Sequence, residues 1–169
     1  MQSLEKFIKQ ALNDKSDHVV SAALVSMIEL YKRGGHSAEI VKKSIGELQD
    51  KINGSKDGFV QYQALLLLFE LKKQDPMSCL KLLYQITQSK VTTSITKCQL
   101  IRYIKTSLVE NTAIDQRMAK SFISYIESCL AKDEDVVQFE AAKSICELFE
   151  VFGTGINVEN AFQVLVQIA

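Results

Sequence analysis

The sequence predicts an all-α protein built as an α-solenoid of stacked antiparallel helix pairs, and three observations support this. Leu, Ile, Ala, Lys, Glu and Gln, which favour helix, dominate a chain of 169 residues with one proline and seven glycines. Helical periodicity of apolar residues runs nearly end to end between short polar gaps. Amphipathic helices alternate with helices that are apolar on every side, as in stacked helix pairs.

Local stop signals mark several boundaries between the predicted elements. The second helix ends in Lys32 and Arg33, cations that suit the negative end of a helix dipole, and Gly34 and Gly35 then terminate it. We expect about nine helices, since the apolar period breaks at each polar gap. They cover residues 2–13, 17–33, 37–53, 58–73, 76–88, 94–109, 115–131, 135–151 and 158–168.

Residues 37–53 predict an amphipathic helix that lies half in water. Its apolar stripe consists of Ile40, Val41, Ile45, Leu48 and Ile52. Its opposite side carries Glu39, Lys42, Lys43, Glu47 and Asp50. Residues 51–54, Lys-Ile-Asn-Gly, end this helix.

Residues 58–73 predict a helix that is covered on several sides. The run ALLLLF at 64–69 leaves almost no polar face, although Asp57 precedes the helix and Lys72 and Lys73 close it. A membrane span needs about 20 apolar residues, far more than this run provides. We therefore expect a buried helix of a protein core.

Further signals mark where helices begin in the second half of the chain. Asp75 and Pro76 are a helix cap followed by proline at the first helical position, where its missing N–H costs nothing. The acidic run at 132–135 precedes the helix 135–151, and negative charge there favours the helix dipole. The last segment, NAFQVLVQIA, is strongly apolar.

The buried helices repeat a Val-x-x-x-Ala signature. It occurs at Val19 and Ala23, at Val60 and Ala64, and at Val137 and Ala141. The spacings of 41 and 77 residues approximate one and two periods of about 40, the range of HEAT and armadillo repeats. We expect the alanine to admit the neighbouring helix and the valine to fill the gap beside it. Residues 94–109 should hold the missing member, without its signature.

The whole chain, 1–169, is predicted to be a single HEAT/armadillo-like segment. Its apolar last helix and its first helix, 2–13, have no polar capping repeat, which solenoids need to remain soluble. We therefore expect an excised internal part of a longer, adaptin-like trunk.

Charge and cysteine content argue against several classes of function. Twenty basic residues balance twenty acidic ones, so the chain lacks the basic excess of nucleic-acid-binding proteins. The first residues, MQSLEKFIKQ, lack the apolar region of a secretory signal, and a cytosolic protein is predicted. The cysteines form no CxxC pair and are expected to be small buried thiols without a metal. They are Cys79, Cys98, Cys129 and Cys146.

No group of residues predicts catalysis. The chain has no GxxxxGK[ST], GxSxG or HExxH motif. We expect His18 to be solvated, Gly153-Thr154-Gly155 to form a helix–helix turn, and Asn53-Gly54-Ser55 to form a turn. The five tyrosines fall at core or groove positions and form no stacking platform. We predict a protein that is not an enzyme, with no catalytic, cofactor-binding or metal residues and no cofactor. A solenoid instead offers a long surface to protein partners, whose contact residues stay unassigned.

Four stretches of the chain match one family in the same order and at similar spacing. They are LEKFIKQALNDK with SAALVSMIELYK, FVQYQALLLLFELKKQD, CQLIRYIKTSLVE, and FISYIESCLAKDEDVVQFEAAKSICEL. The second resembles VQYHALGLLYHV, and the last resembles FIESCL…VVYEAASAIVNL, of the gamma subunits of coatomer, the COPI vesicle coat. The resemblance covers nearly the whole chain, although KRGGHSAEIVKKSIGELQDKIN and TTSITK differ considerably.

This resemblance implies a non-catalytic scaffold of the COPI coat in Golgi-to-ER and intra-Golgi transport. It implies assembly with other coatomer subunits, especially the small zeta subunit, and recruitment of the full-length protein by an Arf-type GTPase. The protein would be cytoplasmic and peripheral on Golgi membranes and COPI vesicles, touching membrane only through the assembled coat.

Two alternatives remain open at this point. A clathrin-adaptor large chain, or another helical-repeat transport protein, would share the fold. A regulatory helical domain of an enzyme or GTPase regulator would require a catalytic domain elsewhere in the same protein.

Overall fold

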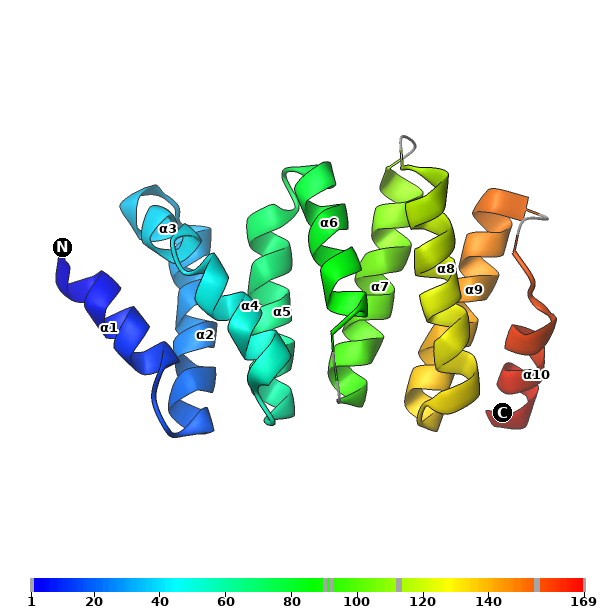
Figure 1. Ribbon diagram of the computed structural model, residues 1–169, viewed down its shortest axis with the longest axis horizontal. Coiled ribbons are helices and arrows are strands. Elements are labelled where there is room, and N and C mark those ends of the chain that lie inside the picture. Colours follow the sequence, from blue (N-terminus) through cyan, green and yellow to red (C-terminus); the bar gives the residue numbers. More distant parts are fainter. Residues whose placement is uncertain (1, 90, 92, 112–113, 154–155, 169) are drawn as a thin grey trace. The chain divides into compact units, whose positions relative to one another are not determined.

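The computed structural model describes residues 2–89, 91, 93–111, 114–153 and 156–168. These residues form ten α-helices and no β-strand, which confirms the predicted all-α fold (Figure 1). The helices belong to two compact units, Met1–Asp75 and Pro76–Ala169. Outside residues 37–53, every helix begins and ends within one residue of its predicted bounds.

The first unit is built around two long helices that lie side by side. Its elements are α1 (Gln2–Leu12), α2 (Asp17–Arg33), α3 (Gly35–Lys42), α4 (Ile45–Gly54) and α5 (Gly58–Lys72). α2 packs against α1, α3 and α5, and α4 packs against α5. The core therefore lies between α2 and α5 and is closed by the shorter helices.

The predicted helix 37–53 is in fact two helices, α3 and α4, and the single-helix prediction is wrong. The chain leaves the helix at Lys43 and Ser44, where Ser44 has φ −92° and ψ 14°. Ser44 is the N-cap of α4, a position that serine favours, and Gly46 is a weak helix former just beyond it. Four of the five members of the predicted apolar stripe, Ile40, Val41, Leu48 and Ile52, are buried, whereas the fifth, Ile45, is half-buried.

α5 is covered on several sides, as predicted. Four side chains of its apolar run are fully buried, namely Ala64, Leu65, Leu67 and Leu68. Asp57 caps this helix, since its Oδ1 accepts hydrogen bonds from the backbone N–H groups of Phe59 and Val60, both at 2.9 Å. The cap satisfies two of the donors that a helix leaves free at its first turn.

The predicted register of the repeat is wrong by one residue in α2. Val60 and Ala64 are fully buried in α5, whereas Val19 is 41% exposed and Ala23 is half-buried. The buried positions of α2 are instead Val20 and Leu24, so that α2 and α5 are related by a period of 40 residues.

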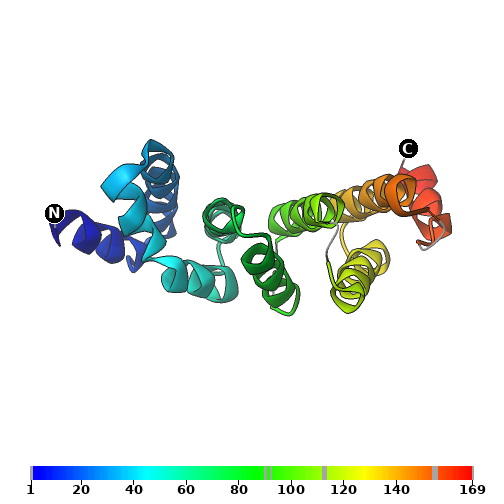
Figure 2. The ribbon, with the colours of Figure 1, turned by 90° about the horizontal axis from the view of Figure 1, so that it is seen from above.

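The second unit has two layers of helices. Its elements are α6 (Pro76–Thr87), α7 (Ser94–Glu110), α8 (Gln116–Lys132), α9 (Asp135–Phe152) and α10 (Glu159–Ile168). α7 and α9 form one layer, α6 and α8 form the other, and α10 packs against α9 (Figure 2). α7 occupies the place predicted for the missing repeat member, beside the third predicted copy in α9, where Val137 and Ala141 are fully buried.

Candidate partner-binding surfaces

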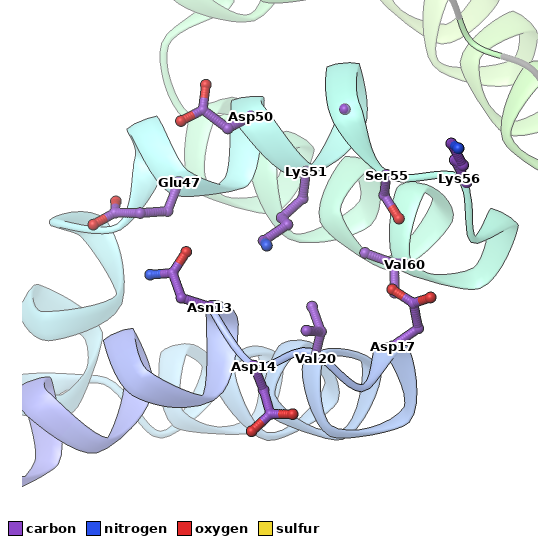
Figure 3. Close-up of a pocket in the computed structure, with 11 residues that line it drawn as sticks. Asn13, Asp14, Asp17, Val20, Glu47, Asp50, Lys51, Ser55, Lys56 and Val60 are labelled. Carbon is purple, nitrogen blue, oxygen red and sulfur yellow. The ribbon is translucent and has the colours of Figure 1, made fainter.

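A pocket of about 460 Å³ lies in the first unit, where the turn between α1 and α2 faces the end of α4 (Figure 3). We call it the acidic pocket. It is lined by Asn13, Asp14, Asp17, Val20, Glu47, Asp50, Lys51, Gly54, Ser55, Lys56 and Val60. Four carboxylates and two ammonium groups therefore surround one opening.

Local hydrogen bonds fix the two chain segments that form the acidic pocket. On one side, Asp14 Oδ1 accepts from the backbone N–H of Ser16 at 2.8 Å and shapes the turn into α2. On the other side, the buried Gln61 Nε2 donates to the carbonyl oxygens of Ile52 and Ser55, at 3.0 and 2.9 Å. These bonds hold the end of α4 against the start of α5.

The charged side chains of the acidic pocket make no salt bridge with any described residue. Figure 3 shows Lys51 extending into the opening, while Asp50 and Lys56 point outward. The excess of carboxylates suits a cationic side chain of a partner protein better than an anionic one.

A second depression in the first unit is lined by lysines that already have partners. It measures about 600 Å³ and lies where Gly34 and Gly35 join α2 to α3, beside the end of α5. Three of its lysines are already paired with a glutamate three residues away on the same helix. These pairs are Lys32–Glu29, Lys42–Glu39 and Lys73–Glu70, of which Lys73 is the residue that follows α5. Because its lysines are paired internally, this depression has less charge to offer a partner than the acidic pocket.

A row of polar contacts joins α7 to α9 and to the turn just before α9 in the second unit. Ser94 Oγ donates to Glu134 at 2.6 Å, Lys97 pairs with Asp133, Arg102 pairs with Glu140 at 2.6 Å, and Lys105 pairs with Glu147. Sequence reasoning missed this row and assigned the acidic run at 132–135 to the α9 dipole alone. The available signal was the seven-residue spacing of Glu140 and Glu147, which places both carboxylates on one face of α9, with Asp133 seven residues earlier in the turn before that helix.

The best-buried member of this row is Glu140, whose side chain is only 8% exposed. The hydrogen bond from the Arg102 guanidinium holds the pKa of this carboxyl below its ordinary value, against the opposing effect of burial. Glu140 is therefore ionised at neutral pH, and the row is a set of charged contacts between two neighbouring helices.

The cysteines are free thiols, and the prediction that all four are buried is correct for three of them. Cys79, Cys98 and Cys129 are buried, whereas Cys146 is half-buried. Burial raises the pKa of Cys129 to about 11, with a further contribution from Asp133. Burial likewise raises the pKa values of Cys98 and Cys146, so these thiols are protonated at neutral pH.

The residues weighed as possible sites lie apart from one another. His18 is exposed in the first turn of α2, as predicted. Gly153 ends α9 with φ 69°, while the rest of the predicted 153–155 turn lies outside the described residues. Asn53 and Gly54 end α4 instead of forming a separate turn. The five tyrosines belong to five different helices, α2, α5, α6, α7 and α8.

Neither a metal site nor a membrane span occurs in the described part of the chain. No cluster of three or more His, Cys, Asp or Glu side chains there could hold a metal ion. In the same residues no helix combines the length and the apolar character that crossing a bilayer requires.

Comparison with known proteins places the chain in a family. Residues 1–169 match the family described as the adaptin N terminal region. The chain is 36% identical to coatomer subunit gamma of Dictyostelium discoideum over 157 residues, which are 93% of this chain and 17% of that protein. It is 35% identical to coatomer subunit gamma-2 of Oryza sativa subsp. japonica and of Bos taurus, each over 88% of this chain and 16% of the relative. The predicted resemblance is confirmed, and the chain spans about a sixth of the length of these relatives.

Proposed function

Since the chain belongs to the adaptin N-terminal family, we propose that it is part of a coatomer gamma subunit and acts as a non-catalytic scaffold of the COPI coat. The observation that carries this proposal is the identity of 32–36% to coatomer gamma subunits of plants, animals and an amoeba over 88–93% of the chain. In this role the protein takes part in Golgi-to-ER and intra-Golgi vesicle transport through contacts between proteins.

The partners of this scaffold are the other coatomer subunits, in particular the small zeta subunit. An Arf-type GTPase recruits the assembled coat, so the protein cycles between cytoplasm and Golgi membranes and COPI vesicles. Unpaired surface charges, such as those of the acidic pocket, support a role in binding proteins, because they are free to complement a partner.

We propose further that the two units belong to one adaptin-like trunk segment. The family match supports this, because it runs through both units without interruption, from residue 1 to residue 169. A helical trunk of this kind works as a binding surface and contributes no reacting groups.

Live-cell imaging tests the proposed role. The protein is tagged at its own gene with a fluorescent protein and viewed beside a tagged beta coatomer subunit and tagged clathrin. We expect it to coincide with beta coatomer on Golgi membranes and to disperse when GTP loading of Arf-type GTPases is blocked. Coincidence with clathrin instead, or a signal that does not respond to the block, would contradict the proposal.

A further inference from the structure

The second unit contains an apolar pocket that none of the surfaces above includes. It has a volume of about 320 Å³ and lies where the end of α7, the first turns of α8 and the end of α9 meet. Six of its lining residues are apolar, namely Leu108, Ile114, Ala119, Ile123, Phe152 and Ile156. Pockets that bind ligands usually measure roughly 300–1,000 Å³, so this one fits one or two side chains and no whole helix.

The apolar pocket has a buried floor and an open rim. Leu108 and Ile156 are 2% and 5% exposed and form the floor. Phe152, at the last position of α9, is 50% exposed, so its ring is available at the rim. A bulky side chain entering the pocket would cover apolar surface that is now in contact with water, which favours binding.

The charge at the rim selects the kind of segment that can enter. Among the described residues that line the pocket, Lys120 is the one ionisable residue, and Arg117 precedes it by one helical turn on α8. Neither cation forms a salt bridge with a described residue. The carboxylates that lie close in sequence to the lining residues or to these cations are not among the lining residues; they are Glu110, Asp115, Glu127 and Glu150. The rim therefore complements an anionic partner.

We propose that this apolar pocket binds a short acidic peptide segment of a partner protein. A leucine- or phenylalanine-sized side chain of the segment occupies the pocket, and a neighbouring carboxylate pairs with Lys120. This assignment rests on the geometry of the second unit and does not depend on the proposed role in the COPI coat.

The proposal can be tested by methyl NMR on the 169-residue chain labelled at isoleucine, because three isoleucines line the pocket. The probe is the synthetic peptide SGDELFEDGS. We expect its addition to shift the methyl signals of Ile114, Ile123 and Ile156 and to leave Ile40 and Ile52 of the first unit unchanged. Absence of these shifts at about 1 mM peptide, the weak end of specific binding, would overturn the proposal.

Two control peptides separate the apolar anchor from the charge. SGDEAAEDGS lacks the anchor, and SGKKLFKKGS reverses the charge. We expect each to bind at least about 5-fold more weakly than the probe, since each loses one of the two interactions. Equal affinity for all three peptides would contradict the proposed recognition.

A matched pair of variants tests whether the peptide binds beside α8. Lys120→Glu should weaken binding of the acidic probe by about 2- to 10-fold and strengthen binding of the basic peptide, as reversal of an exposed charge does. Lys81→Glu on α6 is the control, because Lys81 is also exposed but does not line the pocket. Both substitutions are on exposed surface and leave the fold intact, so equal effects of the two would place the peptide elsewhere and overturn the proposal.

Discussion

Ser144 is a buried polar residue that the fold of α9 leaves without a partner. Its side chain is fully buried, and its hydroxyl makes no hydrogen bond among the described residues. A buried hydroxyl without a hydrogen bond costs about 1–3 kcal/mol, and alanine also favours helix more than serine. At the scale of single residues, Ser144 is thus a side chain that lowers the stability of the folded protein.

We therefore expect Ser144→Ala to raise the free energy of unfolding by about 1 kcal/mol. Urea denaturation followed by circular dichroism measures this change. Ser128→Ala is the matched control, because Ser128 is exposed on α8 and its hydroxyl already donates to the Tyr125 carbonyl at 2.7 Å. A Ser144→Ala protein that unfolds at lower urea than the unmodified chain would show that the hydroxyl is satisfied.

Because the pKa of Cys129 is raised, we expect the folding stability of the protein to fall in alkali. Burial raises its pKa from 9.0 to about 11, so the folded chain holds this proton over a range in which the unfolded chain has released it. Stability therefore falls as the pH rises from about 9 to about 11. Thermal melting between pH 8 and pH 11 measures the fall, and it should be smaller in Cys129→Ala. An equal fall in both proteins would assign it to other groups.

At the scale of elements, the buried face of α5 decides whether the first unit folds. Ala64 is fully buried there, so Ala64→Arg places a charge inside the core and should destabilise the unit by several kcal/mol. Lys42→Ala on α3 is the control. Its side chain is 47% exposed, and the change should leave the melting temperature nearly unchanged. An unchanged melting temperature for Ala64→Arg would contradict the packing of α5.

The contact between α7 and α9 can be measured through its Arg102–Glu140 pair. A double-mutant cycle with Arg102→Ala and Glu140→Ala should give a coupling of about 1 kcal/mol at pH 7. The pKa of Glu140 is lowered in the folded chain, so this stabilisation is present above the unfolded value of 4.5 and is lost as the pH falls through the folded value. The exposed Lys32–Glu29 pair is the control and should couple by less than about 0.5 kcal/mol. Equal coupling in both pairs would mean that the α7–α9 contact adds no stability.

The sequence predicts most helix boundaries but cannot choose between equivalent local patterns. Val19 and Val20 are both apolar, so periodicity alone does not tell which one faces α5. The apolar stripe of residues 37–53 continues through the break at Ser44, and only serine followed by Gly46 signals the end of α3. Such details depend on the neighbouring helix, which sequence patterns do not identify.

The candidate surfaces were harder to predict than the helices, because they join distant segments. The acidic pocket brings residues 13–20 together with residues 47–60. The row of polar contacts beside α7 pairs Lys97 with Asp133 and Lys105 with Glu147, 36 and 42 residues apart. The charges were visible in the sequence, but their pairing or lack of pairing is a property of the packed helices.

At the scale of the whole molecule, the family match covers both units, whereas each candidate surface lies within one of them. The match to the adaptin N-terminal family extends over residues 1–169, and the coatomer gamma relatives cover both units. None of the candidate surfaces is needed for that assignment. The surfaces instead show where a scaffold of this family has charge or apolar area to offer a partner.

Affinity capture of the full-length protein tests most directly whether this chain belongs to a COPI coat subunit, as proposed. The protein is tagged at its own gene, purified from lysate of the source cell, and the retained proteins are quantified by mass spectrometry against an untagged strain. We predict recovery of the zeta subunit and the other coatomer chains in near-equal amounts. Recovery of clathrin-adaptor chains, or of no coat protein, would contradict the claim while leaving the helical fold unchanged.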